Sequence, residues 1–183
     1  MFGFKDYGVC VTVTFLSSLR VLLVMKLSDA LEAIQDHINK LPTESYLAHA
    51  FFMDDGHEEW QIGFVNPSDE EITVFVVSED SVTKNPPAEA LKKPGETINE
   101  LVLEDVGVLA HDALASAKKH LSENYEGHPL KQSIVLLQNL SEYGQVYNIT
   151  LVTETFHMLN IKLSSSSGEV VSEKFDHLMS LKK

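Results

Sequence analysis

The sequence has few of the residues on which several classes of protein depend. A single cysteine, Cys10, stands among 183 residues, so the chain can form neither an internal disulfide framework nor a cysteine-based zinc site. Only 14 basic residues stand against 27 acidic ones, which gives a net charge of −13. This balance argues against binding of nucleic acid and against attraction to an anionic membrane surface, since both need clustered lysine and arginine.

The sequence also lacks the short motifs of catalytic sites. It contains no G-x-S-x-G, no H-E-x-x-H and no glycine-rich phosphate loop among its nine glycines. Its eight histidines include no H-x-x-x-H pair, and His37 and His120 fall near the ends of expected helices, where an imidazolium favours the helix dipole. We therefore expect a protein that is not an enzyme and that has no catalytic residues, no cofactor and no dedicated metal site.

Acidic residues are abundant and unevenly placed. Residues 26–80 carry 13 acidic and 2 basic side chains, whereas residues 108–183 carry 8 and 7. One acidic loop and a nearby strand end form the candidate edge for a cation or a basic partner. Its residues are Asp54, Asp55, Glu58, Glu59, Glu79 and Asp80. The order of a calcium-binding loop is missing, so the sequence favours a solvated acidic rim that only increases solubility over a cation site.

The first 24 residues are apolar but fit no standard targeting segment. Lys5 and Asp6 cancel in charge, Arg20 interrupts the apolar run, and no small-x-small cleavage site follows. Residues 1–24 are therefore a doubtful leader or alternative-start segment. The expected location is cytoplasmic if translation starts at Met25, and otherwise exported or associated with the cell envelope.

A nine-residue segment recurs in part, with four of its nine positions identical in the two copies. Residues 29–37, which begin Asp-Ala-Leu, return as residues 112–120, and each copy precedes three β-like runs. Apolar residues at helical spacing predict a helix over 29–40 and another over 111–124. We predict an α+β fold of two repeated units, each with one helix packed on an antiparallel three-stranded meander, because one striped helix can close each small core.

The predicted strands set the domain boundaries. Alternating or apolar runs lie at 47–53, 59–65 and 71–78 in the first unit, and at 133–138, 145–153 and 156–163 in the second. Pro86, Pro87, Pro94 and Gly95 mark a linker between them. The expected boundaries are 25–82 for the first unit, 83–107 for the linker and 108–183 for the second unit.

The second unit resembles PepSY domains. Residues 111–117 are similar to the E/D-A-L-x-x-A helix opening of that family, 144–149 to its x-x-Y-x-V strand, and 164–171 to its closing D-A-x-T-G-E-V turn. Ser164 and Ser165 replace the usual Asp-Ala, and the first unit lacks the Gly-Glu-Val. The resemblance covers residues 108–172 well and 27–82 loosely. It implies a helix on an antiparallel sheet in a non-catalytic module that inhibits or modulates a partner such as a peptidase.

These observations together predict a non-catalytic protein-binding or regulatory module whose partner is another protein. The alternative is a small-ligand or cation-binding sensor that uses a groove between the two units. A broad exposed apolar or acidic face would favour the first function, and a pocket lined by convergent polar groups would favour the second. The sequence does not indicate an oligomeric state.

Overall fold

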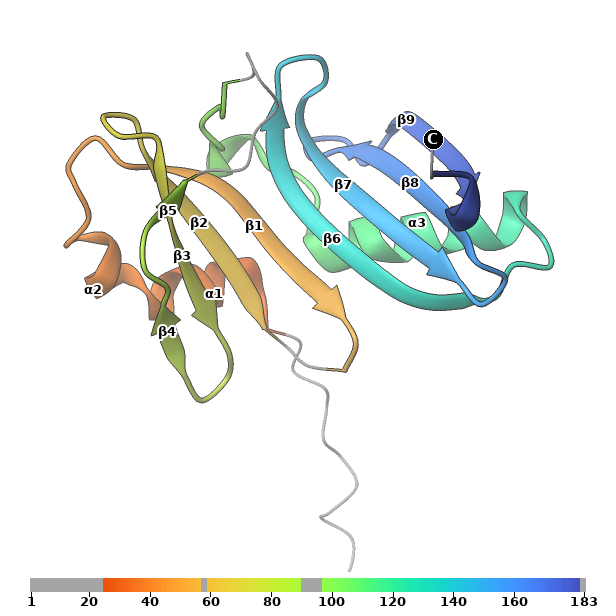
Figure 1. Ribbon diagram of the computed structural model, residues 1–183, viewed down its shortest axis with the longest axis horizontal. Coiled ribbons are helices and arrows are strands. Elements are labelled where there is room, and N and C mark those ends of the chain that lie inside the picture. The colour runs from red at the N-terminus through yellow and green to blue at the C-terminus, as the bar shows by residue number, and fades with distance from the viewer. Residues whose placement is uncertain (1–24, 57–58, 90–96, 182–183) are drawn as a thin grey trace, which may run out of the picture.

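The computed structural model describes residues 25–56, 59–89 and 97–181, so the predicted leader segment lies outside the described residues. One antiparallel sheet of nine strands runs through both halves of this part of the chain, in the order β4-β3-β2-β1-β6-β7-β8-β9, with β5 also pairing with β3 (Figure 1). The strands are β1 (Tyr46–Asp54), β2 (Trp60–Asn66), β3 (Glu71–Val77), β4 (Val82–Lys84), β5 (Ala88–Glu89), β6 (Leu130–Leu140), β7 (Gly144–Thr153), β8 (His157–Ser164) and β9 (Val170–His177).

The predicted fold class, two repeated units with one helix on a three-stranded meander each, is wrong. Strand β1 pairs with β2 on one side and with β6 on the other, where Ala50 lies opposite Leu137. An isolated first meander would leave one backbone edge of β1 without hydrogen-bond partners, and β6 supplies them. The strands of both halves therefore form one sheet, which β4, β5 and β9 extend at its two ends.

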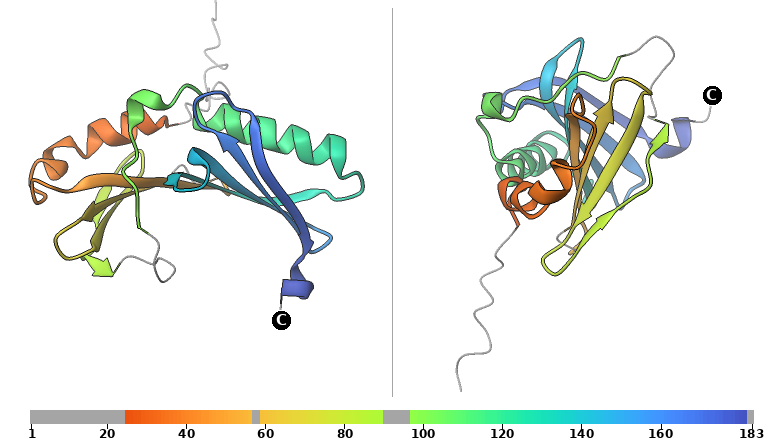
Figure 2. Two further views of the ribbon diagram at one scale, coloured as in Figure 1. Left: turned by 90° about the horizontal axis from the view of Figure 1, so that it is seen from above. Right: turned by 90° about the vertical axis from the view of Figure 1, so that its left-hand side faces the viewer.

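The three α-helices lie on one face of this sheet, whereas the short 3-10 helix that follows β9 lies away from them, on the other side (Figure 2). The helices are α1 (Leu27–Ala33), α2 (Gln35–Ile38) and α3 (Ala110–Asn124), with short 3-10 helices η1 (Leu103–Asp105) and η2 (Leu178–Leu181). The continuous first helix predicted over 29–40 is instead interrupted at Ile34, where φ is −101° and ψ is 5°. No helix in the described part of the chain has both the length and the hydropathy needed to cross a membrane.

A single hydrophobic core fills the space between the helices and the sheet. The predicted apolar stripe of the second helix is confirmed, because Ala113, Leu114, Ala117 and Leu121 are all buried against the sheet. The cluster of buried side chains is continuous from the first helix to the last strands, and it includes both Ile34 and Leu163. The two halves therefore share a core as well as a sheet.

Candidate functional site

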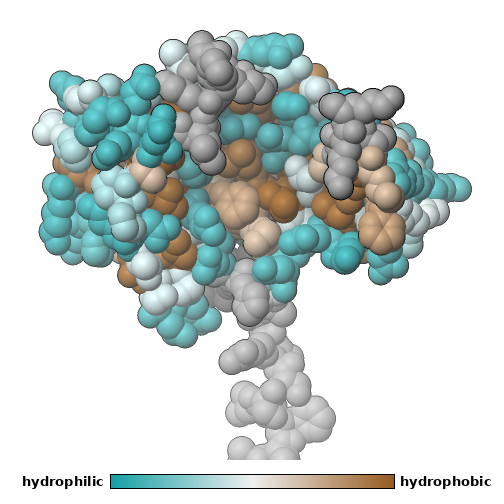
Figure 3. Space-filling view, viewed as in Figure 1, coloured by the Kyte–Doolittle hydropathy of each residue, from teal (hydrophilic) through white to brown (hydrophobic). Residues whose placement is uncertain are grey.

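The face of the sheet opposite the helices carries an apolar block at its centre. Phe51 and Met53 of β1 lie directly opposite Leu136 and Ile134 of β6, and all four side chains are partly buried. Side chains of successive residues in a strand point to opposite faces of the sheet, and the residues between these four, such as Phe52, face the core. The ends of the sheet bend away from the helices, so this open face is concave (Figure 2), and apolar residues are visible at its centre (Figure 3).

A hydrogen-bonded polar cluster borders this block on the β7 and β8 side. The amide nitrogen of Asn160 donates to Asn148 Oδ1 at 2.7 Å and to Thr150 Oγ1 at 3.1 Å, and Lys162 Nζ donates to Asn160 Oδ1 at 3.2 Å. These groups satisfy one another, so the polar side of the open face is ordered without a ligand. The apolar block is thus the part of the face where a partner would gain the most binding free energy by covering it.

A small hollow of about 150 Å³ lies at the end of the apolar block. Its floor contains Phe51 and Met53, and Asp55, Glu59 and Gln61 complete its wall. Both carboxylates are exposed, and the Gln61 amide donates to Glu59 at 3.4 Å. An apolar floor with carboxylates at its rim suits a side chain with an apolar stem and a cationic head.

The six acidic residues predicted from the sequence have different positions. Asp55 and Glu59 line the hollow, whereas Asp54 forms an ion pair with Lys118 of α3 at 2.5 Å and so faces the helices. Glu79 and Asp80 are exposed in the turn after β3, and Glu58 lies outside the described residues. Among the residues that the structure describes, no group of three or more His, Cys, Asp or Glu side chains could hold a metal ion.

His49 occupies the open face beside the apolar block. Its ring lies over Gly63 of the neighbouring strand so closely that a methyl group at that glycine would collide with it. Burial disfavours the imidazolium and lowers the pKa of His49 from its usual 6.5. Gly63 is therefore required for close approach of the ring, and His49 is neutral when the protein is folded at neutral pH.

We expect His49 to make folding sensitive to mild acid. Because its pKa is lower in the folded protein than in the unfolded chain, the unfolded chain binds more protons as pH falls below 6.5. Stability should decrease from pH 6.5 down to the folded pKa of His49. Urea denaturation at about pH 7.5 and about pH 5.5 measures the free energy of unfolding at each pH. The decrease between the two pH values should be smaller for His49→Gln than for the natural protein. An equal loss in both proteins would contradict this role.

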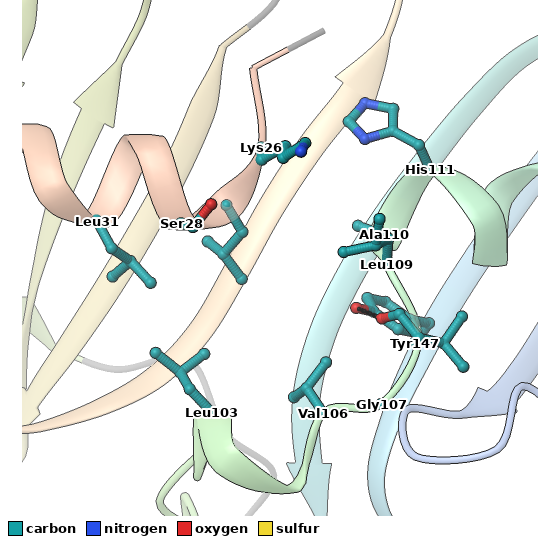
Figure 4. Close-up of a pocket in the computed structure, with 12 residues that line it drawn as sticks. Lys26, Ser28, Leu31, Leu103, Val106, Gly107, Leu109, Ala110, His111 and Tyr147 are labelled. Atoms are coloured by element: carbon teal, nitrogen blue, oxygen red, sulfur yellow. Dashed lines mark hydrogen bonds between the residues drawn. The ribbon is translucent and has the colours of Figure 1, made fainter.

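A larger cleft of about 380 Å³ lies on the helix side, where the two halves meet. It is bounded by the first turns of α1, the start of α3 and the segment 103–109 that leads into α3 (Figure 4). The wall includes Tyr147, whose hydroxyl donates to the Val108 carbonyl at 2.6 Å. Burial, with a smaller contribution from the charge of Asp112, raises the pKa of Tyr147 to about 12, so this wall stays uncharged.

Sequence reasoning missed the open-face block and a cluster of histidines, and it expected a groove between the two halves without identifying the residues that line the cleft. The signal for the open-face block is the pair of continuous apolar runs at 50–53 and 134–137, which indicate strands with two apolar faces. The ring of His157 lies 4.4 Å from that of His128 and 4.7 Å from that of His177, measured between centroids. These three residues are far apart in sequence, so spacing alone could not bring them together.

No family model and no curated protein matches this chain. It is similar in structure to a protein described as a putative lipoprotein from Clostridium difficile 630, with a TM-score of 0.59, 15% identity, and coverage of 84% of this chain and 94% of that one. The Bacillus megaterium YpeB C-terminal domain also aligns, at 13% identity over 86% of this chain and 65% of that one, but its TM-score of 0.23 carries no structural argument. The first comparison shows that the two proteins share a fold.

Proposed function

We propose that the protein is a non-catalytic binding or regulatory module that recognises another protein through the open face of its sheet. The observation that carries this proposal is the apolar block of Phe51, Met53, Ile134 and Leu136 at the centre of a concave face. No α-helix of the described residues covers this face, since all of them pack on the opposite one. Contiguous apolar groups with a polar border are typical of interaction surfaces.

The chemistry of the face indicates the kind of segment that binds there. The partner contributes apolar side chains over the block and a lysine or arginine whose stem enters the hollow between Asp55 and Glu59. The net charge of −13 also favours a basic partner, because it accelerates encounter with positively charged molecules. The resemblance of residues 108–172 to PepSY domains supports a peptidase as the class of partner.

The test uses a short labelled peptide of alternating leucine and lysine, with a leucine–glutamate peptide as its control. We expect fluorescence anisotropy to show binding of the lysine peptide only. Asp55→Asn combined with Glu59→Gln should weaken it about fivefold, as the loss of two exposed ion pairs does. Glu126→Gln with Glu142→Gln removes the same charge away from the hollow and should leave affinity nearly unchanged.

A second variant separates the apolar and the charged contributions. Leu136→Asn places a polar side chain in the middle of the block, beside Asn148 of the next strand, and should weaken the lysine peptide by about tenfold or more. Equal binding by Leu136→Asn and the natural protein would rule out this face as the site. Equal binding of the lysine and glutamate peptides would rule out the charge recognition.

A further inference from the structure

We infer that the cleft between α1 and α3 binds a small aliphatic carboxylate, with its chain against the leucines of the cleft and its carboxylate beside Lys26 and His111. This site is separate from the open face, since the cleft lies on the helix side of the sheet and the open face lies on the other side (Figure 2). Its volume of about 380 Å³ is within the range of small-molecule sites.

The lining explains the aliphatic part of the ligand. Most of the wall is apolar, and its members are Leu27, Leu31, Leu103, Val106, Val108, Leu109 and Ala110. Leu109 is 58% exposed and Leu103 is 37% exposed, although both belong to a concave wall. An aliphatic chain in the cleft would remove this apolar surface from water, which is the main source of binding free energy for such a ligand.

The charges explain the carboxylate. The chain has 27 acidic residues, yet none of the twelve residues that line the cleft is acidic. Lys26 and His111 lie across from each other at one end of the cleft, and Ser28 is nearby (Figure 4). An anionic group is therefore favoured at this end and a cationic group is disfavoured.

The start of α3 adds to this preference. The helix has 15 residues, and Leu109 at its N-cap position provides no side-chain hydrogen bond to the first turn. Its positive dipole end lies at the cleft wall, where Ala110 and His111 belong to the lining, and Asp112 in the same first turn offsets part of this positive charge. Tyr147 adds no charge, because burial raises the pKa of its hydroxyl, which donates to the Val108 carbonyl.

Trp60 provides an internal probe for this cleft. It is the single tryptophan of the chain, and its indole nitrogen donates to the Met25 carbonyl at 3.0 Å, directly before Lys26. Its ring also lies 6.5 Å from that of His111, edge to face. A ligand that contacts Lys26 and His111 should therefore change the fluorescence of Trp60.

The experiment titrates the full chain with decanoate, below its micelle concentration, and with decanol, which has the same chain without the charge. We expect a saturable change in Trp60 fluorescence and a higher melting temperature with decanoate, and weaker binding of decanol. Lys26→Met should weaken decanoate about fivefold and leave decanol unchanged, because it removes the charge and keeps an apolar stem. Lys40→Met, an exposed site outside the cleft, is the matched control.

Leu109→Asp tests the position of the ligand. The side chain is exposed, so the fold should tolerate the change, while a carboxylate in the wall should weaken decanoate by about tenfold or more. Leu136→Asn on the open face should leave decanoate binding intact, which separates this site from the proposed protein-binding face. Equal affinity for decanol and decanoate would overturn the carboxylate assignment. Binding that survives Leu109→Asp, or no binding of either compound, would overturn the site.

Discussion

Replacing Ile34 by aspartate should cost the protein at least ~3 kcal/mol of its free energy of unfolding, because the change buries a charge without a partner. Ile34 is 0% exposed, and it lies at the joint between α1 and α2, where it belongs to the shared hydrophobic core. Leu114→Asp in α3 should have a comparable effect, since that side chain is only 4% exposed. Chemical denaturation followed by circular dichroism measures both.

The control for this prediction is Gln35→Asp, which adds the same charge one residue later on an exposed position. It should change stability by no more than about 0.5 kcal/mol. Similar stabilities for Ile34→Asp and Gln35→Asp would mean that the first helical segment faces the sheet differently from the structure.

The local elements could largely be predicted from the sequence because each has its own pattern. The alternation of residues 71–77 defines β3, and the apolar stripe of residues 110–121 defines the buried side of α3. The break at Ile34 could not be predicted, because the apolar spacing continues through it. At this break the Ile34 side chain is fully buried although its backbone lies outside the helical conformation.

The pairing of β1 with β6 could not be predicted from alternation, which says nothing about which strand edges meet. Six residue pairs join these strands, and each pair links positions that are far apart in the chain, from 89 residues for His49 and Gln138 to 79 residues for Asp54 and Ser133. The continuous apolar runs in both strands are typical of central strands, and they indicate in retrospect that neither was an edge.

In the candidate sites too, features within one loop could be predicted from the sequence, and features that depend on packing between distant segments could not. The hairpin between β1 and β2 brings Asp55 and Glu59 together, and the sequence placed both in one loop region. Side-chain alternation sends Asp54 to the other face, where only the packing of α3 supplies Lys118 as its partner. The cleft depends on the path of residues 103–109 between the two halves, for which the sequence carries no periodic signal.

Replacing Ala50 by proline should unfold both halves of the protein together and cost at least ~3 kcal/mol. Ala50 is fully buried at the centre of β1, between Ile62 of β2 and Leu137 of β6. Proline lacks the backbone N–H that a central strand uses, and its ring does not fit between two paired neighbours. The substitution therefore disrupts β1, the strand that joins the two halves of the sheet.

The matched control is Ala88→Pro in the two-residue edge strand β5, where the residue is exposed and only Ile72 of β3 pairs with it. We expect a cost below about 1 kcal/mol there. For Ala50→Pro, Trp60 fluorescence should follow the first half, and hydrogen exchange of β7 and β8 amides should follow the second. Because sheet and core are continuous from Ile34 to Leu163, both should report one shared transition at lower denaturant concentration. If β7 and β8 amides kept their native protection from hydrogen exchange after the Trp60 signal was lost, the β1–β6 pairing would contribute little to the stability of the second half. The second half would then be stable without the first.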